Sequence, residues 1–312
     1  MNTLLYLVAR VLIGCIQCLP LRLVALLGRL GGTLGWIIDR RHRNAAVENI
    51  QASFPDRTAT EVLAIAKENF KRIGENYACA VKTASMTDEQ VRKVLGGVHV
   101  DRYLDNETRS WVAAVGHFGN FELYARSHLF IPDIHSATTY RGLRQPALDK
   151  LLLHLRRQSG GDFFERRKEG SLLKERMRDG KVILGLLADQ HAGNRGEWLP
   201  FLGRECSTSA APAVFALRYD CPLHTAICYR VGLARWEIEF GEEIPTKSDG
   251  KPRPITEICR DMNAALEEAI RRDPANWFWV HRRWKNPSKF QIERAKQIAK
   301  GEAVEETDNT QE

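Results

Sequence analysis

The 312-residue sequence lacks the short signatures of several common enzyme classes. No Gly-x-Ser-x-Gly motif occurs, which counts against a serine hydrolase with a nucleophile elbow. No P-loop, dinucleotide-binding fingerprint or zinc-ligand spacing occurs either, and the Gly160-Gly161 pair has no strand-to-helix context. The sequence therefore gives no reason to expect a nucleotide cofactor or a metal, and it contains no internal repeat.

Cysteine is also sparse. The seven cysteines are scattered and odd in number, which argues against a disulfide framework and for a reducing compartment. Cys15 and Cys18 form a Cys-x-x-Cys pair, but this pair lies in an apolar helical run. The same run has neither a basic leading segment nor a small-x-small cleavage site, so we do not expect a cleaved signal peptide.

The charge is unevenly distributed along the chain. The net charge is +7 and the sequence pI is about 9.1. Residues 302–312 contain acidic residues but no Lys or Arg. The net charge of the remaining residues is therefore more positive than that of the whole chain. A basic body favours anionic partners such as phospholipid, nucleic acid or an acidic protein. We expect the tail, residues 301–312, to be disordered.

The N-terminus is apolar and helical in pattern. Residues 3–19 are short for a membrane span, and Arg10 in the middle would be costly there. A second apolar segment, 21–38, also carries arginines. We therefore predict that residues 1–38 form a monotopic anchor lying in one leaflet. The basic cluster at 39–44 favours the cytoplasmic side. A buried helical pair and a single spanning helix remain alternatives.

The most informative stretch surrounds His117. The apolar run 111–115 predicts a strand covered on both faces. Gly116 and Gly119 permit a tight turn, and Asn120 is a good N-cap for a following helix. This strand–turn–helix unit places His117 at the carboxyl end of a strand, where open α/β sheets bind their ligands.

Glu122 follows His117 by five residues. From the first helical turn its carboxylate can reach back to the imidazole. A carboxylate on one ring nitrogen fixes the tautomer and leaves the other nitrogen free to take a proton from a hydroxyl. In the alternative, Glu122 only complements the helix dipole and His117 is an ordinary turn residue. The spacing alone leaves both interpretations open.

The rest of the chain alternates between strand and helix patterns. The pattern predicts further strands at 135–139, 181–187, 222–230 and 235–240. It also predicts helices within 44–80 (split at Pro55), at 145–158 and at 255–271, and a helix that is capped by Thr208 or Ser209 and runs to Leu217. Such alternation is typical of an α/β fold with a mainly parallel central sheet flanked by helices. The strand at 181–187 delivers Asp189 and Gln190 to the same edge as His117.

Five segments resemble a known family. His117 to Glu122 resembles the His-x4-Asp/Glu motif of the glycerolipid acyltransferase superfamily, in the form found in the late acyltransferases of lipid A biosynthesis (lauroyl/myristoyl transferases). Four further segments resemble blocks of that family, in the family's order: Tyr140–Asp149, Leu187–Gln190, Pro200–Gly203 and Trp277–Lys285. One departure is Gly142, which stands where the family has proline. The catalytic domain implied spans residues 39–300.

The resemblance implies a membrane-associated O-acyltransferase at the cytoplasmic face of a bacterial inner membrane. Such an enzyme moves a fatty acyl chain from an acyl thioester, usually on acyl carrier protein, to a hydroxyl of a lipid A precursor. It needs no cofactor or metal, since the thioester is a co-substrate. His117 would be the general base and Glu122 its partner. An acidic carrier protein and an anionic glycolipid both fit the basic chain.

The resemblance also implies supporting residues. It maps a functional aspartate onto Asp189 and a functional arginine near Arg156, where Arg157, Arg166 and Arg167 are competitors. Arg141 matches the arginine of the family's Tyr-Arg block, and a guanidinium suits a phosphate or an oxyanion. Asn120 and Gln190 complete the supporting set.

Two other functions remain open. The enzyme could acylate another glycolipid or a phospholipid with acyl-CoA as donor. Alternatively, the chain could be a non-catalytic basic protein that binds membrane lipid or nucleic acid. Residues 277–285 mix tryptophans with cations, as nucleic-acid-binding surfaces do, but core packing or an interfacial belt explains the mixture equally well. We do not expect nucleic acid as a partner.

Overall fold

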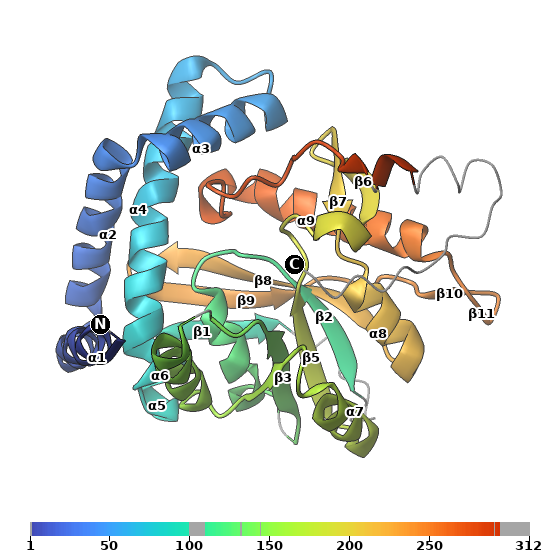
Figure 1. Ribbon diagram of the computed structural model, residues 1–312, viewed down its shortest axis with the longest axis horizontal. Helices are drawn as coiled ribbons and strands as arrows, with labels where there is room; N and C mark the ends of the chain where they lie inside the picture. The colour runs from blue at the N-terminus through green and yellow to red at the C-terminus, as the bar shows by residue number, and fades with distance from the viewer. Residues whose placement is uncertain (1, 100–109, 132, 144, 290, 294–312) are drawn as a thin grey trace.

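The computed structural model describes residues 2–99, 110–131, 133–143, 145–289 and 291–293 (Figure 1). The predicted tail, 301–312, lies outside the described residues. Helices cover a central sheet, and the apolar N-terminal helices stand at one end of the molecule (Figure 1).

The central sheet is mainly parallel, as predicted. Within the described residues its strand order is β1-β9-β8-β2-β5-β3-β4. The strands from β8 to β4 run parallel, whereas β9 is antiparallel to β8 and β1 is parallel to β9. The bounds are β1 (Leu95–His99), β2 (Trp111–Val115), β3 (His135–Tyr140), β4 (Asp162–Glu165), β5 (Val182–Leu187), β8 (Leu223–Gly232) and β9 (Arg235–Phe240). Two small antiparallel pairs lie outside it: β6 (Glu197–Phe201) with β7 (Arg204–Thr208), and β10 (Lys247–Ser248) with β11 (Lys251–Pro252).

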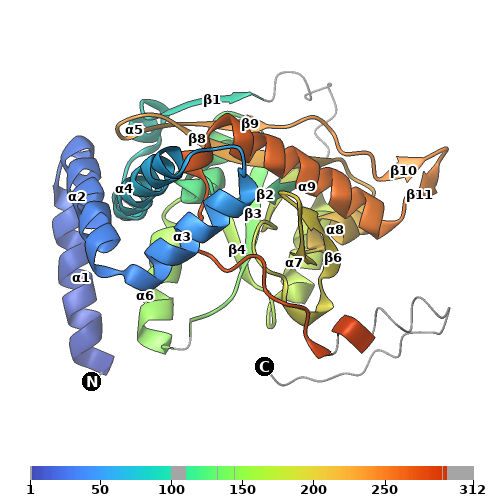
Figure 2. The same cartoon turned by 90° about the horizontal axis from the view of Figure 1, so that it is seen from above.

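Helices pack on both faces of this sheet (Figure 2). The helices of the first half are α1 (Asn2–Cys18), α2 (Leu21–Ile38), α3 (Arg40–Ser53), α4 (Ala59–Ala84), α5 (Asp88–Arg92), the 3₁₀ helix η1 (Phe121–Leu129) and α6 (Pro146–Arg157). Those of the second half are α7 (Gly170–Asp179), η2 (Gly193–Arg195), α8 (Ala211–Tyr219), α9 (Ile255–Arg272) and η3 (Pro274–Asn276). The helix expected to be capped by Thr208 or Ser209 begins at Ala211 and ends at Tyr219. Ala210 occupies the N-cap position, and Oγ of Ser209 accepts a hydrogen bond from the backbone N–H of Ala211 at 3.4 Å.

Strand β2 is buried along its whole length because both of its faces meet a core. Val112 and Ala114 belong to the core under α8 and α9. Trp111, Ala113 and Val115 belong to a second core that includes residues of η1 on the other face. Alternate side chains thus enter opposite cores, which is why the strand reads as an unbroken apolar run.

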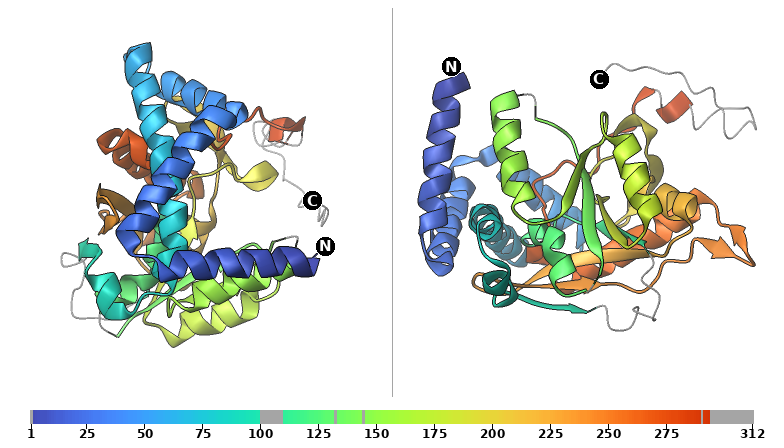
Figure 3. Two further views of the ribbon diagram at one scale, coloured as in Figure 1. Left: turned by 90° about the vertical axis from the view of Figure 1, so that its left-hand side faces the viewer. Right: turned by 90° about the horizontal axis from the view of Figure 1, so that it is seen from below.

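Helix α2 packs along α4 at a glycine contact. A Cβ atom at Gly28 would lie 2.5 Å from the carbonyl oxygen of Gly74, and one at Gly32 would lie closer still to the carbonyl oxygen of Phe70. Apolar side chains on α1 and α2 remain exposed: Leu5, Leu7, Val8, Val11, Leu12, Leu23, Leu26, Leu27, Leu30, Leu34, Ile37 and Ile38. In the described residues, α2 is the one helix whose length and composition would suit a membrane span. Figure 3 shows α1 and α2 on the outer side of α4.

Candidate active site

The strand register brings His117 and Asp189 together. Val115 of β2 pairs with Leu187 of β5, and each chain continues two residues further, to His117 and Asp189. The two side chains therefore meet at the carboxyl edge of the sheet. Nδ1 of His117 lies 2.7 Å from Oδ1 of Asp189, and the backbone N–H of His117 donates to Oδ2 at 2.7 Å.

Asp189 is almost completely buried, with 1% of its surface exposed. The indole N–H of Trp277 also donates to Oδ2, at 2.7 Å. Burial alone would raise the pKa of Asp189, but the charge and hydrogen bonds of His117, together with the Trp277 bond, outweigh burial and lower the pKa. An ionised carboxylate only accepts hydrogen bonds, so Nδ1 of His117 carries a proton and, while the ring is neutral, Nε2 keeps its lone pair.

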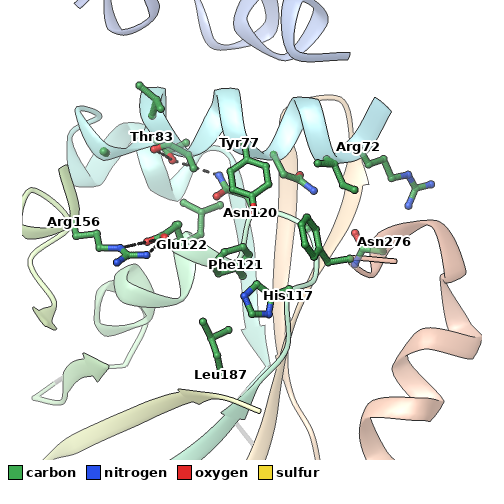
Figure 4. Close-up of a pocket in the computed structure, with 18 of the residues that line it drawn as sticks. Arg72, Tyr77, Thr83, His117, Asn120, Phe121, Glu122, Arg156, Leu187 and Asn276 are labelled. Atoms are coloured by element: carbon green, nitrogen blue, oxygen red, sulfur yellow. Dashed lines mark hydrogen bonds and ion pairs between the residues drawn. The ribbon is translucent and has the colours of Figure 1, made fainter. Parts of the chain in front are cut away.

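Glu122 does not hold His117, and the predicted pairing of these two side chains is therefore corrected. Oε1 of Glu122 accepts a 2.7 Å hydrogen bond from Nη2 of Arg156 (Figure 4). Both carboxylate oxygens of Glu122 also accept from Nε of Arg156, at 3.3 and 3.2 Å. Within the described residues Glu122 makes no hydrogen bond to His117. The physical reason is the turn: Gly119, with φ of +50°, leads into a 3₁₀ helix that points Glu122 toward α6.

The other predicted site residues take different positions. Asn120 occupies the predicted N-cap position of η1, but its buried side chain makes no capping hydrogen bond and instead donates to Oγ1 of Thr83 on α4, at 3.4 Å. Arg156 stands at the site, and Arg141 and Gln190 line a neighbouring cavity. The competitors of Arg156 (Arg157, Arg166 and Arg167) are all exposed, and of these Arg166 lines that same cavity.

Two cavities meet at His117. The first, about 370 Å³, lies between α4, η1 and α6, and its lining is largely apolar (Figure 4). The second, about 860 Å³, opens over the ends of β3, β4 and β5. The residues that line both are His117, Phe121, Glu122, Leu152, Arg156 and Leu187. A group bound in either cavity can therefore approach the imidazole.

Local sequence reasoning missed the role of residues 277–285 at the site. Trp277 binds Asp189, and the ring of Phe278 lies 6.0 Å from that of His117. Arg283 is fully buried and donates to the carbonyl oxygens of Gln190 and Ser207. The segment thus packs largely into the core, and Trp277 and Phe278 also line the first cavity. Trp277 and Trp279 are buried and present no face for stacking on bases. Its match to a family block was the one signal that could have found it.

The model of the family described as "Bacterial lipid A biosynthesis acyltransferase" matches residues 2–286. This chain belongs to that family. As a lipid A acyltransferase it is an enzyme that transfers acyl groups, and the resemblance found in its motifs is confirmed. The N-terminal helices lie inside the matched range, so they are part of the family's own sequence pattern.

Individual lipid A acyltransferases resemble the chain at low identity. It is 23% identical over 290 residues to a lipid A biosynthesis acyltransferase of Haemophilus influenzae. It is 22% identical over 272 residues to a lipid A biosynthesis palmitoleoyltransferase of Escherichia coli, and equally so to a lipid A biosynthesis acyltransferase of Shigella flexneri. Each comparison covers 86% of both chains, so the likeness extends over most of their length.

Proposed function

We propose that the protein moves a fatty acyl chain from an acyl thioester to a hydroxyl of a lipid A precursor, with His117 as general base. The observation that carries this proposal is the His117–Asp189 pair at the junction of two cavities. Asp189 holds the imidazole in the tautomer whose Nε2 can accept the proton of a hydroxyl.

The chemistry needs no acyl-enzyme, because the thioester is already activated. Nε2 of His117 takes the hydroxyl proton while the oxygen attacks the thioester carbonyl. The carbon–sulfur bond then breaks, the imidazolium returns the proton to the sulfur, and the products are an ester and a free thiol. Arg156 stands beside the same junction, where its guanidinium is a candidate to stabilise the oxyanion. Glu122 orients that guanidinium through their ion pair.

The first cavity suits an acyl chain. Its walls come from α4 and α6 and include Ile73, Ala80, Val81, Leu152 and Leu155. An apolar chain gains about 0.8 kcal/mol for each methylene it buries. His117 is one of the residues that line this cavity, so a chain lying in it can have its carboxyl end near the imidazole.

We also propose that α1 and α2 rest on the membrane without crossing it. Arg29 of α2 binds Glu68 and Glu75 of α4, and the fully buried Glu75 also binds Arg230 of β8. These ion pairs, with the glycine contact, attach α2 to the body of the enzyme. Arg29 therefore points inward, while the exposed side chains of α2 are mostly apolar, which is the arrangement of a monotopic helix. The basic residues that follow at Arg40 to Arg43 favour the cytoplasmic face.

A reconstituted transfer assay tests this function. The full-length protein is incubated with a lipid A precursor and an acyl thioester, and the product is identified by mass spectrometry. Acyl transfer that disappears in His117→Ala supports the proposal. Undiminished transfer in that variant would refute the general-base role. Direct competition between acyl carrier protein and coenzyme A thioesters then identifies the donor; the basic chain supports the acidic carrier protein.

A further inference from the structure

The second cavity carries a group of cations that the proposed chemistry does not use. Arg141 follows β3, Arg166 follows β4, Lys174 lies on α7 and Arg218 lies in the last turn of α8. Four separate segments thus bring a positive side chain to one cavity. A further hollow of about 580 Å³ is also lined by Lys174 and Arg218 and extends to Arg178. We call Arg141, Arg166, Lys174 and Arg218 the cationic lip.

Among the described residues, three acidic side chains line the cavity against five basic ones. Glu122 is engaged by Arg156. Glu165 accepts hydrogen bonds from the backbone N–H groups of Arg167 and Lys168, both at 2.9 Å, and Glu169 accepts one from the backbone of Glu165. Within the part of the chain that the structure describes, the lip side chains form no ion pair. The cavity wall is therefore left with an excess of positive charge.

The helices that carry Lys174 and Arg218 lie far from the apolar helices. In Figure 2, α7 and α8 lie on the opposite side of the molecule from α1 and α2, and Figure 3 shows the same separation. Lys174 and Arg218 therefore come from helices that do not adjoin α1 and α2. The four cations of the lip line a cavity that is also lined by His117, so an anion that they bind would belong to a molecule at the site.

We propose that the cationic lip is a subsite for a phosphate ester carried by one of the two substrates. The inference rests on the proposed acyl transfer, because it assumes that a substrate occupies the second cavity. Guanidinium and ammonium groups converging from several segments suit the oxygens of a phosphate, which accept several charge-assisted hydrogen bonds at once. The phosphate could belong to the thioester donor or to the glycolipid acceptor; both present the same chemistry to the lip.

The test compares three full-length proteins at constant ionic strength: wild type, the double variant Lys174→Ala/Arg218→Ala, and the control Lys251→Ala/Arg260→Ala. The control removes the same charge from exposed positions on β11 and α9. Inorganic phosphate is the probe, and its binding is measured by calorimetry and by inhibition of transfer. The KM of donor and acceptor is measured with and without their phosphate groups.

We expect phosphate to compete with one substrate in the wild type and the control. In the lip variant we expect the inhibition constant, and the KM of that substrate, to rise about tenfold or more, since each lost contact is a charge-assisted one. Removing the phosphate from that substrate should abolish the difference between variant and control. Competition with the donor assigns the lip to the donor's phosphate, and competition with the acceptor assigns it to the glycolipid's.

Equal phosphate binding and equal KM values in all three proteins would overturn the inference. Calorimetry keeps this result separate from a failure of the proposed function. Phosphate binding that is lost only in the lip variant supports the subsite even if no acyl transfer is found. If acyl transfer is found and the lip variant matches the control in phosphate binding and KM, the subsite is rejected and the proposed function stands.

Discussion

Replacing Asp189 with asparagine should remove the general base while leaving its side chain in place. Oδ2 of Asp189 faces two donors, the backbone N–H of His117 and the indole N–H of Trp277, both at 2.7 Å. An amide oxygen in that position keeps both bonds. The amide NH₂ then faces Nδ1 of His117, which must become an acceptor and shift its proton to Nε2. A protonated Nε2 cannot take a proton from the acceptor hydroxyl.

The opposite amide orientation is less favourable. In that orientation the NH₂ group would face the backbone N–H of His117 and the indole N–H of Trp277, which would both lose their acceptor. Each buried donor left without an acceptor costs about 1–3 kcal/mol. We therefore expect Asp189→Asn to lower kcat by about 10²–10⁴-fold, the range of general-base catalysis. That loss corresponds to roughly 3–5 kcal/mol of activation free energy. The measurement is the initial rate of acyl transfer at saturating substrate, followed by mass spectrometry.

The control for this experiment is Asp162→Asn, which removes a carboxylate from β4 that is half exposed and bound to Arg176. It should retain wild-type turnover. Thermal unfolding of both variants establishes that the fold persists. A folded Asp189→Asn enzyme that turns over within about threefold of wild type would show that the His117–Asp189 pair is not the catalytic base, and the mechanism above would be abandoned.

Other perturbations test neighbouring parts of the structure. Trp277→Phe removes one of the donors to Asp189 and should lower kcat by less than Asp189→Asn does, with KM unchanged; a change in KM alone would contradict this role. Gly32→Ala should destabilise the α2–α4 contact by about 1–3 kcal/mol in thermal or chemical unfolding, whereas Gly31→Ala, with open space around its Cβ, should not. Ala80→Phe should shorten the preferred acyl chain in a mixed-donor assay by filling the first cavity; an unchanged chain preference would place the chain elsewhere. Asp189 has a lowered pKa, so its contribution to stability is complete above its unfolded pKa and is lost as the pH falls through its lower folded pKa. The stability difference between wild type and Asp189→Asn should therefore shrink only below about pH 4.

Local pattern was sufficient to predict many units of the fold, but not strands β1, β4, β6 and β7 or helix α7. The segment 21–38 was predicted from its apolar composition and is helix α2 within the same bounds. The run 111–115 was predicted as a strand buried on both faces and is β2, with every residue buried. Such features depend on short-range spacing, turn residues and runs of apolar side chains, all of which can be recognised from neighbouring residues in the sequence.

The partners within the site were decided by tertiary structure. Glu122 is close to His117 in sequence, yet it pairs with Arg156, 34 residues away, because the turn at Gly119 directs it toward α6. Asp189 is 72 residues from His117, and the two meet because β2 and β5 are neighbours in register. The sequence by itself determined that a histidine would stand at the end of a buried strand. It also determined the family to which the chain belongs. Which carboxylate would hold that histidine depended on strand pairing, since hydrogen bonds between strands join residues whose separation no local pattern encodes.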